Sequence, residues 1–143
     1  MIYKEYGNTG KKVSALGFGG MRFKKEEYDR DPEICAEIVR YANSRGINYF
    51  DTAPGYCDDM SEKIFCLAFK QMPEKFFVST KSSTWSDKTS DDVRKRCEIS
   101  LERMNVEKIN FFHMWCIMNM EHYRKVMAPG GPYEGAVKLK REG

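Results

Sequence analysis

The stretch Ile47-Asn-Tyr-Phe-Asp-Thr-Ala-Pro-Gly-Tyr56 decides the fold, because it joins a short apolar run to a polar residue and a turn. Aromatic and β-branched residues favour extended backbone, so Ile47–Asp51 predicts a strand that ends at a carboxylate. Gly46 stands just before this strand and is typical of a helix C-terminus. A helix is therefore expected to lead into the strand, and a loop carrying Tyr56 is expected to follow it.

Strands and amphipathic helices alternate outward from this stretch. Asn8–Gly10 has turn chemistry and predicts a hairpin ahead of the main fold. Further strands are expected over Val13–Phe18, Phe76–Lys81 and Ile109–His113. The expected helices begin at Pro32, at the capping-box-like Asp59–Glu62, at Thr89–Asp92 and, after a loop containing Pro129–Pro132, near Tyr133.

Apolar residues at helical spacing give two of these helices a face to bury. On the first helix this face consists of Ile34, Ile38 and Ala42, with Cys35 and Val39 beside them. On the third helix it consists of Val93, Cys97, Leu101 and Met104. Apolar strands that alternate with such helices predict an α/β fold, in which helices cover a parallel sheet.

The ends of the expected strands recur at a nearly constant interval. Gly20, Asp51, Lys81 and His113 are separated by 31, 30 and 32 residues. A βα repeat of uniform length produces this spacing, and four such units make half of a (β/α)8 TIM barrel of about 250 residues. A flavodoxin-like open sheet is the alternative, but the first strand–helix turn lacks its phosphate-binding pattern. We therefore expect residues 1–143 to form the N-terminal half of a barrel.

Composition indicates a globular chain with no nucleic-acid or membrane partner. Of 143 residues, 41% are hydrophobic and 31% are charged, and the net charge is +3 without a dense Lys/Arg block. No apolar run reaches membrane-spanning length, and the N-terminus lacks the core of a signal peptide. The five cysteines form no C-x-x-C pair, which is typical of reduced thiols in a cytoplasmic protein.

Four polar side chains are expected at the C-terminal ends of the strands, where TIM barrels carry their active sites. They are a carboxylate, a phenol, an ammonium and an imidazole: Asp51, Tyr56, Lys81 and His113. A phenol has a pKa of about 10, and we expect a nearby ammonium, itself held by a carboxylate, to lower that pKa. Tyr56 is then a candidate general acid and base, and His113 can orient a carbonyl oxygen. The set contains no reductant, so hydride must come from a cofactor.

A metal-dependent barrel hydrolase that uses Asp51 and His113 is a further alternative. The sequence offers too few clustered ligands to favour it, and no residue is assigned to a metal.

Five motifs carry a resemblance to a known family: Gly17–Arg22, Asn48–Tyr56, Ser61–Glu62, Ser79–Lys81 and Phe111–His113. Their order and spacing resemble those of the aldo-keto reductases over essentially the whole chain. The resemblance implies an NADP(H)-dependent oxidoreductase that interconverts small carbonyl compounds and alcohols. It also implies a catalytic tetrad of Asp51, Tyr56, Lys81 and His113, and a nicotinamide site bordered by Gly20, Met21, Arg22 and Asp51.

Two further expectations concern what lies beyond this half of the barrel. The segments His113–Ile117 and Met127–Tyr133 are similar to a subgroup with a C-terminal ferredoxin-like extension, so iron–sulfur clusters are expected only in such an extension. Family members continue past the position of Gly143 into a second half that holds the phosphate and adenosine of NADP(H). The alternative to an enzyme is therefore a non-catalytic half-barrel that self-associates through its open strand edges.

Overall fold

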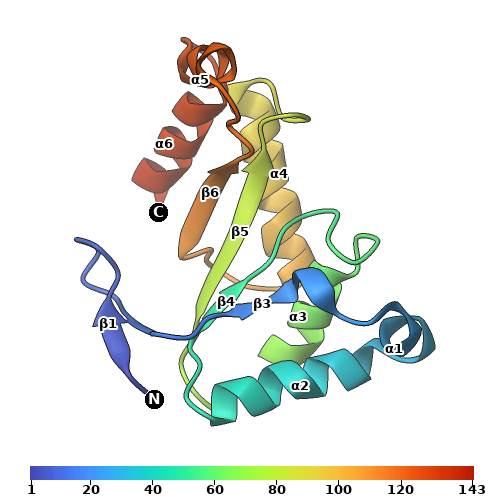
Figure 1. The fold of residues 1–143 in the computed structure, drawn as a ribbon. Helices are drawn as coiled ribbons and strands as arrows, with labels where there is room; N and C mark the ends of the chain where they lie inside the picture. The colour runs from blue at the N-terminus through green and yellow to red at the C-terminus, as the bar shows by residue number, and fades with distance from the viewer.

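Four parallel strands form the central sheet, in the order β3-β4-β5-β6 (Figure 1). The computed structural model describes residues 1–143. The strands are β3 (Phe18–Gly19), β4 (Tyr49–Asp51), β5 (Phe77–Ser83) and β6 (Phe111–Trp115). The helices are η1 (Gly20–Arg22), α1 (Lys25–Arg30), α2 (Pro32–Ser44), α3 (Ser61–Phe69), α4 (Ser90–Met104), α5 (Met120–Met127) and α6 (Pro132–Glu142). The parallel pairing and the intervening helices confirm the predicted α/β class and the strand–helix order of part of a TIM barrel.

The N-terminal hairpin is present, but the expected strand Val13–Phe18 is not continuous. Val13 belongs to β2 (Lys12–Ser14), which pairs antiparallel with β1 (Tyr3–Glu5), whereas Phe18 begins β3. The backbone bends between the two strands, where the Ser14 hydroxyl donates to the carbonyl of Leu16 over 2.6 Å. The Asn48 side chain accepts from the Ser14 amide over 2.7 Å and fixes the hairpin to the start of β4.

Two of the predicted helix starts are confirmed together with their capping chemistry. Asp31 accepts from the amide of Glu33 ahead of Pro32, the first residue of α2. Thr89 and Asp92 form a complete capping box at α4. The expected cap at Asp59 is wrong, because α3 begins at Ser61 without a side-chain cap and the Asp59 carboxylate binds elsewhere.

The helix α5 was not predicted, nor were the short elements η1 and α1. All three lie in connections expected to be loops, and α1 and α5 have only six and eight residues. The polar signal for α5 is Asn119, whose side chain accepts from the amide of His122. Short connecting helices of this kind lack the apolar periodicity on which sequence prediction depends.

An aromatic core fills the space between the outer face of the sheet and the helices α2 and α3. Phe50, Phe65, Ile64 and Val39 are at most 1% exposed. In Figure 1, the helices α2, α3 and α4 lie along this same side of the sheet.

The buried face of α2 is rotated relative to the predicted one. Ile38 is 45% exposed, whereas Asn43 is fully buried. Asn43 is buried at low cost because its amide donates to Ile47 O and its oxygen accepts from the Glu74 amide. On α4 only Val93 and Met104 of the predicted face are fully buried, and Cys97 and Leu101 are half-buried.

The inner face of the sheet is arranged in levels set by the strand register. Tyr49 pairs with Phe77, and Tyr6 from the hairpin stacks on Tyr49 and contacts Phe111. These rings pack together at the N-terminal end of the inner face. The polar side chains nearer the C-terminal ends of the strands therefore lie against a layer of aromatic rings.

We expect Gly20→Ala to destabilise the protein. A Cβ atom at Gly20 would lie 2.4 Å from Cε2 of Phe65 and 2.5 Å from Oγ of Ser61, and both residues are fully buried. Overpacking of this kind lowers the free energy of unfolding by about 1–3 kcal/mol, which urea denaturation measures. Gly19→Ala is the control, because nothing lies within 4 Å of its Cβ position. Equal stability of the two variants would contradict the close contact.

Candidate active site

The strand register places the candidate residues on two successive levels of the inner face. Asp51 pairs with Ser79, and Lys81 pairs with His113 one level higher. The prediction that each of these residues ends its strand is therefore wrong for Lys81 and His113, since β5 and β6 each continue for two residues. The nearly equal spacing along the sequence does not reveal that Asp51 lies one level below Lys81 and His113. This stagger follows from the tilt of strands in a barrel.

Lys81 and Asp51 form the central contact of the site. The Lys81 ammonium lies 2.6 Å from Oδ2 of Asp51 and 2.7 Å from the carbonyl oxygen of Thr52. The Lys81 side chain is 11% exposed and that of Asp51 is 30% exposed. Because Lys81 extends from the upper level down to Asp51, the pair joins β4 to β5 inside the sheet.

Ser79 is a member of the site to which sequence reasoning assigned no role. It is fully buried, and its hydroxyl donates to Oδ1 of Asp51 over 2.8 Å. Each oxygen of the carboxylate is therefore held by a different residue of β5. The available signal was the two-residue spacing from Lys81, which places both side chains on one face of a strand.

Tyr56 lies in the loop between β4 and α3, beside the ion pair. The Lys81 ammonium lies 5.1 Å from the centre of the Tyr56 ring, over its face, and Trp115 contacts that ring edge-on at a centroid distance of 6.0 Å. Lys81 is thus close to Tyr56, but its hydrogen bonds go to Asp51 and Thr52.

Burial raises the pKa of the Tyr56 phenol, and the nearby charge of Asp51 raises it further. The expectation that the ammonium lowers this pKa is wrong for this structure. Burial has the largest effect, and the ammonium directs its hydrogen bonds to Asp51 and Thr52 O and not to the phenol. The phenol is consequently protonated at neutral pH and is a proton donor rather than a phenolate.

His113 reaches the site from β6. Its Nε2 lies 3.4 Å from the hydroxyl of Tyr49, another residue that sequence reasoning did not assign. Burial lowers the pKa of His113 below its usual 6.5, although Asp51 opposes this shift. The imidazole is therefore neutral at pH 7 and can donate one hydrogen bond without bringing a charge.

Three of the four candidate cofactor residues, Gly20, Met21 and Arg22, follow β3, and the fourth, Asp51, ends β4 beside Gly19. The carbonyl of Gly20 accepts from the Ser61 hydroxyl over 2.9 Å, so its position is fixed by the start of α3. Met21 is 44% exposed, and Arg22 follows it on the surface. Both line a cavity of about 530 Å³ that also includes Tyr56. The structure thus brings Met21 and Arg22 together beside the phenol.

Two further features concern a metal site and a membrane-spanning helix. No group of three or more His, Cys, Asp or Glu side chains is placed so that it can hold a metal ion. None of the helices has the length and apolar character needed to cross a membrane.

We expect His113 to make stability dependent on pH. Its pKa is lower in the folded state, so the unfolded chain binds the proton more readily. The contribution is fully present above the unfolded pKa and is lost as pH falls through the folded pKa. Urea denaturation between about pH 7 and about pH 5 should show a steeper loss of stability for the native protein than for His113→Gln. An NMR titration midpoint for His113 at or above 6.5 would contradict this assignment.

Comparison with protein families finds a match that covers nearly the whole chain. The model of the aldo/keto reductase family matches residues 15–142. An L-galactose dehydrogenase from Arabidopsis thaliana is 35% identical over 113 residues, covering 75% of this chain and 35% of that protein. An NADH-specific methylglyoxal reductase from Escherichia coli (strain K12) is 30% identical over 116 residues, covering 68% of this chain and 33% of that protein.

Solved structures show the same fold. A putative aldo-keto reductase from Pseudomonas aeruginosa superposes with a TM-score of 0.82 at 26% identity, covering 99% of this chain and 56% of that one. An aldo/keto reductase from Klebsiella pneumoniae in complex with NADP and acetate has a TM-score of 0.69 at 22% identity, covering 92% and 43%. The chain spans about a third of these curated relatives and about half of these solved chains. By its motifs, its fold and the matched family model, the chain belongs to the aldo/keto reductase family.

Proposed function

We propose that the protein is an NADP(H)-dependent oxidoreductase that interconverts carbonyl compounds and alcohols, with Tyr56 as general acid and base. The observation that carries the proposal is the Lys81 ammonium, bound to Asp51 and Thr52 and lying 5.1 Å from the centre of the Tyr56 ring. This arrangement places a fixed positive charge, 11% exposed, beside a half-buried phenol. Such a charge stabilises the negative oxygen that forms when a carbonyl is reduced.

Each residue of the tetrad has a distinct task in this proposal. Tyr56, protonated because burial raises its pKa, donates its proton to the developing alkoxide in the direction of reduction. Lys81, which Asp51 fixes, stabilises by its charge the negative oxygen that develops on the substrate. His113, neutral because burial lowers its pKa, donates a hydrogen bond that orients the carbonyl oxygen. NADP(H), when bound, supplies or accepts the hydride.

The residues at the end of β3 fit a nicotinamide cofactor. The backbone of Gly20 is fixed from the core side, where it packs against Phe65 and its carbonyl accepts from the Ser61 hydroxyl. The cavity lined by Met21, Arg22 and Tyr56 adjoins it, so a cofactor there would contact Tyr56. The NADP complex of the Klebsiella relative and a second Klebsiella pneumoniae structure in complex with NADPH support the cofactor class.

The proposal also covers the extent of the barrel, the substrate class, the location of the protein and its partners. Residues 1–143 form the N-terminal half of the barrel, which is supported by the share of the Pseudomonas chain that they cover. The substrate is a small carbonyl compound or alcohol, as the names of the relatives from Arabidopsis and Escherichia coli suggest. Five free cysteines favour the cytoplasm. Iron–sulfur clusters in a C-terminal extension and the absence of a nucleic-acid partner stay predictions from the sequence.

The test of the proposed function is NADPH oxidation with simple aldehydes. Tyr56→Phe should lower kcat at least about a hundredfold, because it removes the proton donor and keeps the ring. Tyr123→Phe is the matched control, since Tyr123 lies on α5 and is 43% exposed. Unchanged turnover in Tyr56→Phe would exclude the assigned role. No NADPH oxidation by the native protein with any aldehyde would exclude the function.

A second candidate function is self-association through the sheet edges. The outer edges of β3 and β6 have no strand partner, and the segment after β6 exposes Ile117 and Met118 by 38% and 70%. Unpaired strands beside exposed apolar side chains favour contact between copies. Sedimentation of the 143-residue chain should therefore show a mass that rises with concentration, and Ile117→Lys should reduce this rise. A constant monomer mass would contradict the second candidate.

A further inference from the structure

The loop that carries Tyr56 has an uncommon backbone. Three consecutive non-glycine residues after it are left-handed, with φ of 54° at Cys57, 53° at Asp58 and 67° at Asp59. Gly55, just before Tyr56, has a φ of 82°. Side chains disfavour this conformation, so a run of three persists only where the surroundings hold it. The contacts of this loop therefore decide where Tyr56 lies.

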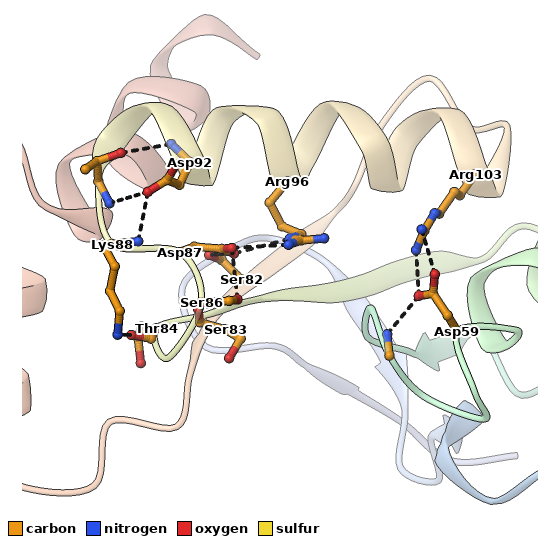
Figure 2. A network of polar contacts seen from close by, with 12 residues as sticks. Asp59, Ser82, Ser83, Thr84, Ser86, Asp87, Lys88, Asp92, Arg96 and Arg103 are labelled. Atoms are coloured by element: carbon orange, nitrogen blue, oxygen red, sulfur yellow. Dashed lines mark hydrogen bonds and ion pairs between the residues drawn. The ribbon is translucent and has the colours of Figure 1, made fainter.

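The strongest of these contacts joins Asp59 to Arg103 near the end of α4 (Figure 2). Nη1 of Arg103 donates to Oδ1 of Asp59 over 2.7 Å, and Nη2 lies 2.6 Å from Oδ2. Oδ1 also accepts from the amide of Gly55 over 3.0 Å. One carboxylate thus closes the loop on itself across Tyr56 and fixes it to the helix.

Arg103 is itself held in place from a second side. Its Nη1 lies 3.6 Å from Oε2 of Glu62, a carboxylate that is 1% exposed. The other oxygen of Glu62 accepts from the Thr80 hydroxyl over 2.9 Å, one residue before Lys81 in β5. The guanidinium therefore links the Tyr56 loop to the strand that carries Lys81.

The loop has further polar contacts: the Cys57 thiol donates to Gly20 O, the Tyr28 hydroxyl donates to Asp58, and the second ion pair is more exposed. Asp58 pairs with Lys25 at 2.6 Å, but their side chains are 66% and 63% exposed. Arg103 is 28% exposed and makes a two-pronged contact, which is stronger and more directional than a single exposed pair. Of the two ion pairs that hold the loop, Arg103–Asp59 is thus the stronger constraint.

We propose that Arg103 is a positioning residue, which acts through Asp59 to hold the left-handed loop so that the Tyr56 ring lies over the Lys81 ammonium. The proposal rests on the proposed function, because it assigns to Arg103 a role in the proton transfer by Tyr56. The ion pairs of Arg103 go to Asp59 and Glu62 and not to Tyr56, although Arg103 lines a cavity of about 330 Å³ together with Lys81.

The kinetic test compares two arginines of the same helix. Arg103→Gln should lower kcat for NADPH-dependent aldehyde reduction on the order of tenfold to a hundredfold, and the Kd for NADPH should change by less than about twofold. Arg103→Lys, which keeps the charge but loses the fork, should lie between the native protein and Arg103→Gln. Arg94→Gln is the matched control, because it removes a two-bond contact with Glu142 from α4 without touching the loop.

A variant of Asp59 distinguishes the effect of the ion pair from the effect of backbone strain at this residue. Asp59→Gly relieves the left-handed conformation but removes the carboxylate, and it should lower kcat as Arg103→Gln does. The double variant should be no worse than either single one, because the two residues act as one unit. Full kcat in Asp59→Gly, or equal kcat in Arg103→Gln and Arg94→Gln, would overturn the proposal.

A second measurement needs no activity. Trp115 contacts the Tyr56 ring, and in a Trp85→Phe background it is the only tryptophan. Acrylamide should quench its fluorescence more strongly in Arg103→Gln than in Arg94→Gln, with thermal melting recorded for both. Equal quenching would overturn the positioning role. If the native protein reduces no aldehyde but the quenching differs, the proposed function fails while the constraint on the loop stands.

Discussion

The ammonium of Lys81 is the point on which the arrangement of the inner face depends. Taking a charge out of water is costly, and at 11% exposure Lys81 recovers that cost only through Asp51 and Thr52 O. Removing one partner of such a pair typically destabilises a protein by about 3–5 kcal/mol, because the other charge stays buried. The register must therefore keep Asp51 one level below Lys81, and Ser79 completes the carboxylate's coordination. The same geometry that stabilises the pair creates a fixed positive charge beside Tyr56.

The outer face of the sheet carries the packed core, and the inner face carries the candidate site. On the outer face, Phe50 and Phe65 pack edge-to-face at 6.1 Å in a core closed to water. Because that packing holds β4 in place, the stability of the strand does not require apolar side chains on its inner face. The outer face of β5 is different, because Thr80 and Ser82 bind the carboxylates of Glu62 and Asp87. These buried bonds fix β5 to α3 and to the loop before α4, and they make the strand that carries Lys81 rigid.

The site residues follow from sequence to the extent that each has a local signal. Asp51 and Lys81 stand in motifs at strand positions, so their meeting could be predicted from parallel topology. The stagger between them could not, because register is set by packing between strands and not by spacing along the chain. Asp59 shows the same limit: its spacing to Glu62 fits a capping box, yet Arg103 binds it from 44 residues away. A local sequence pattern cannot reveal that a distant side chain such as Arg103 binds the expected capping residue. Nor can it reveal the left-handed backbone that this ion pair holds.

Tyr56 differs from Asp51, Lys81 and His113 because it lies on a loop and not on a strand. A strand residue inherits its position from the sheet, whereas a loop residue needs contacts of its own. The contacts here come from both neighbouring layers: Lys81 and Trp115 on the inner side, and Arg103 through Asp59 on the helix side. A backbone held in a conformation it disfavours can move when those contacts change. Tyr56, the proton donor in the proposed mechanism, is therefore the one residue of the four whose position depends on the side-chain contacts of its loop.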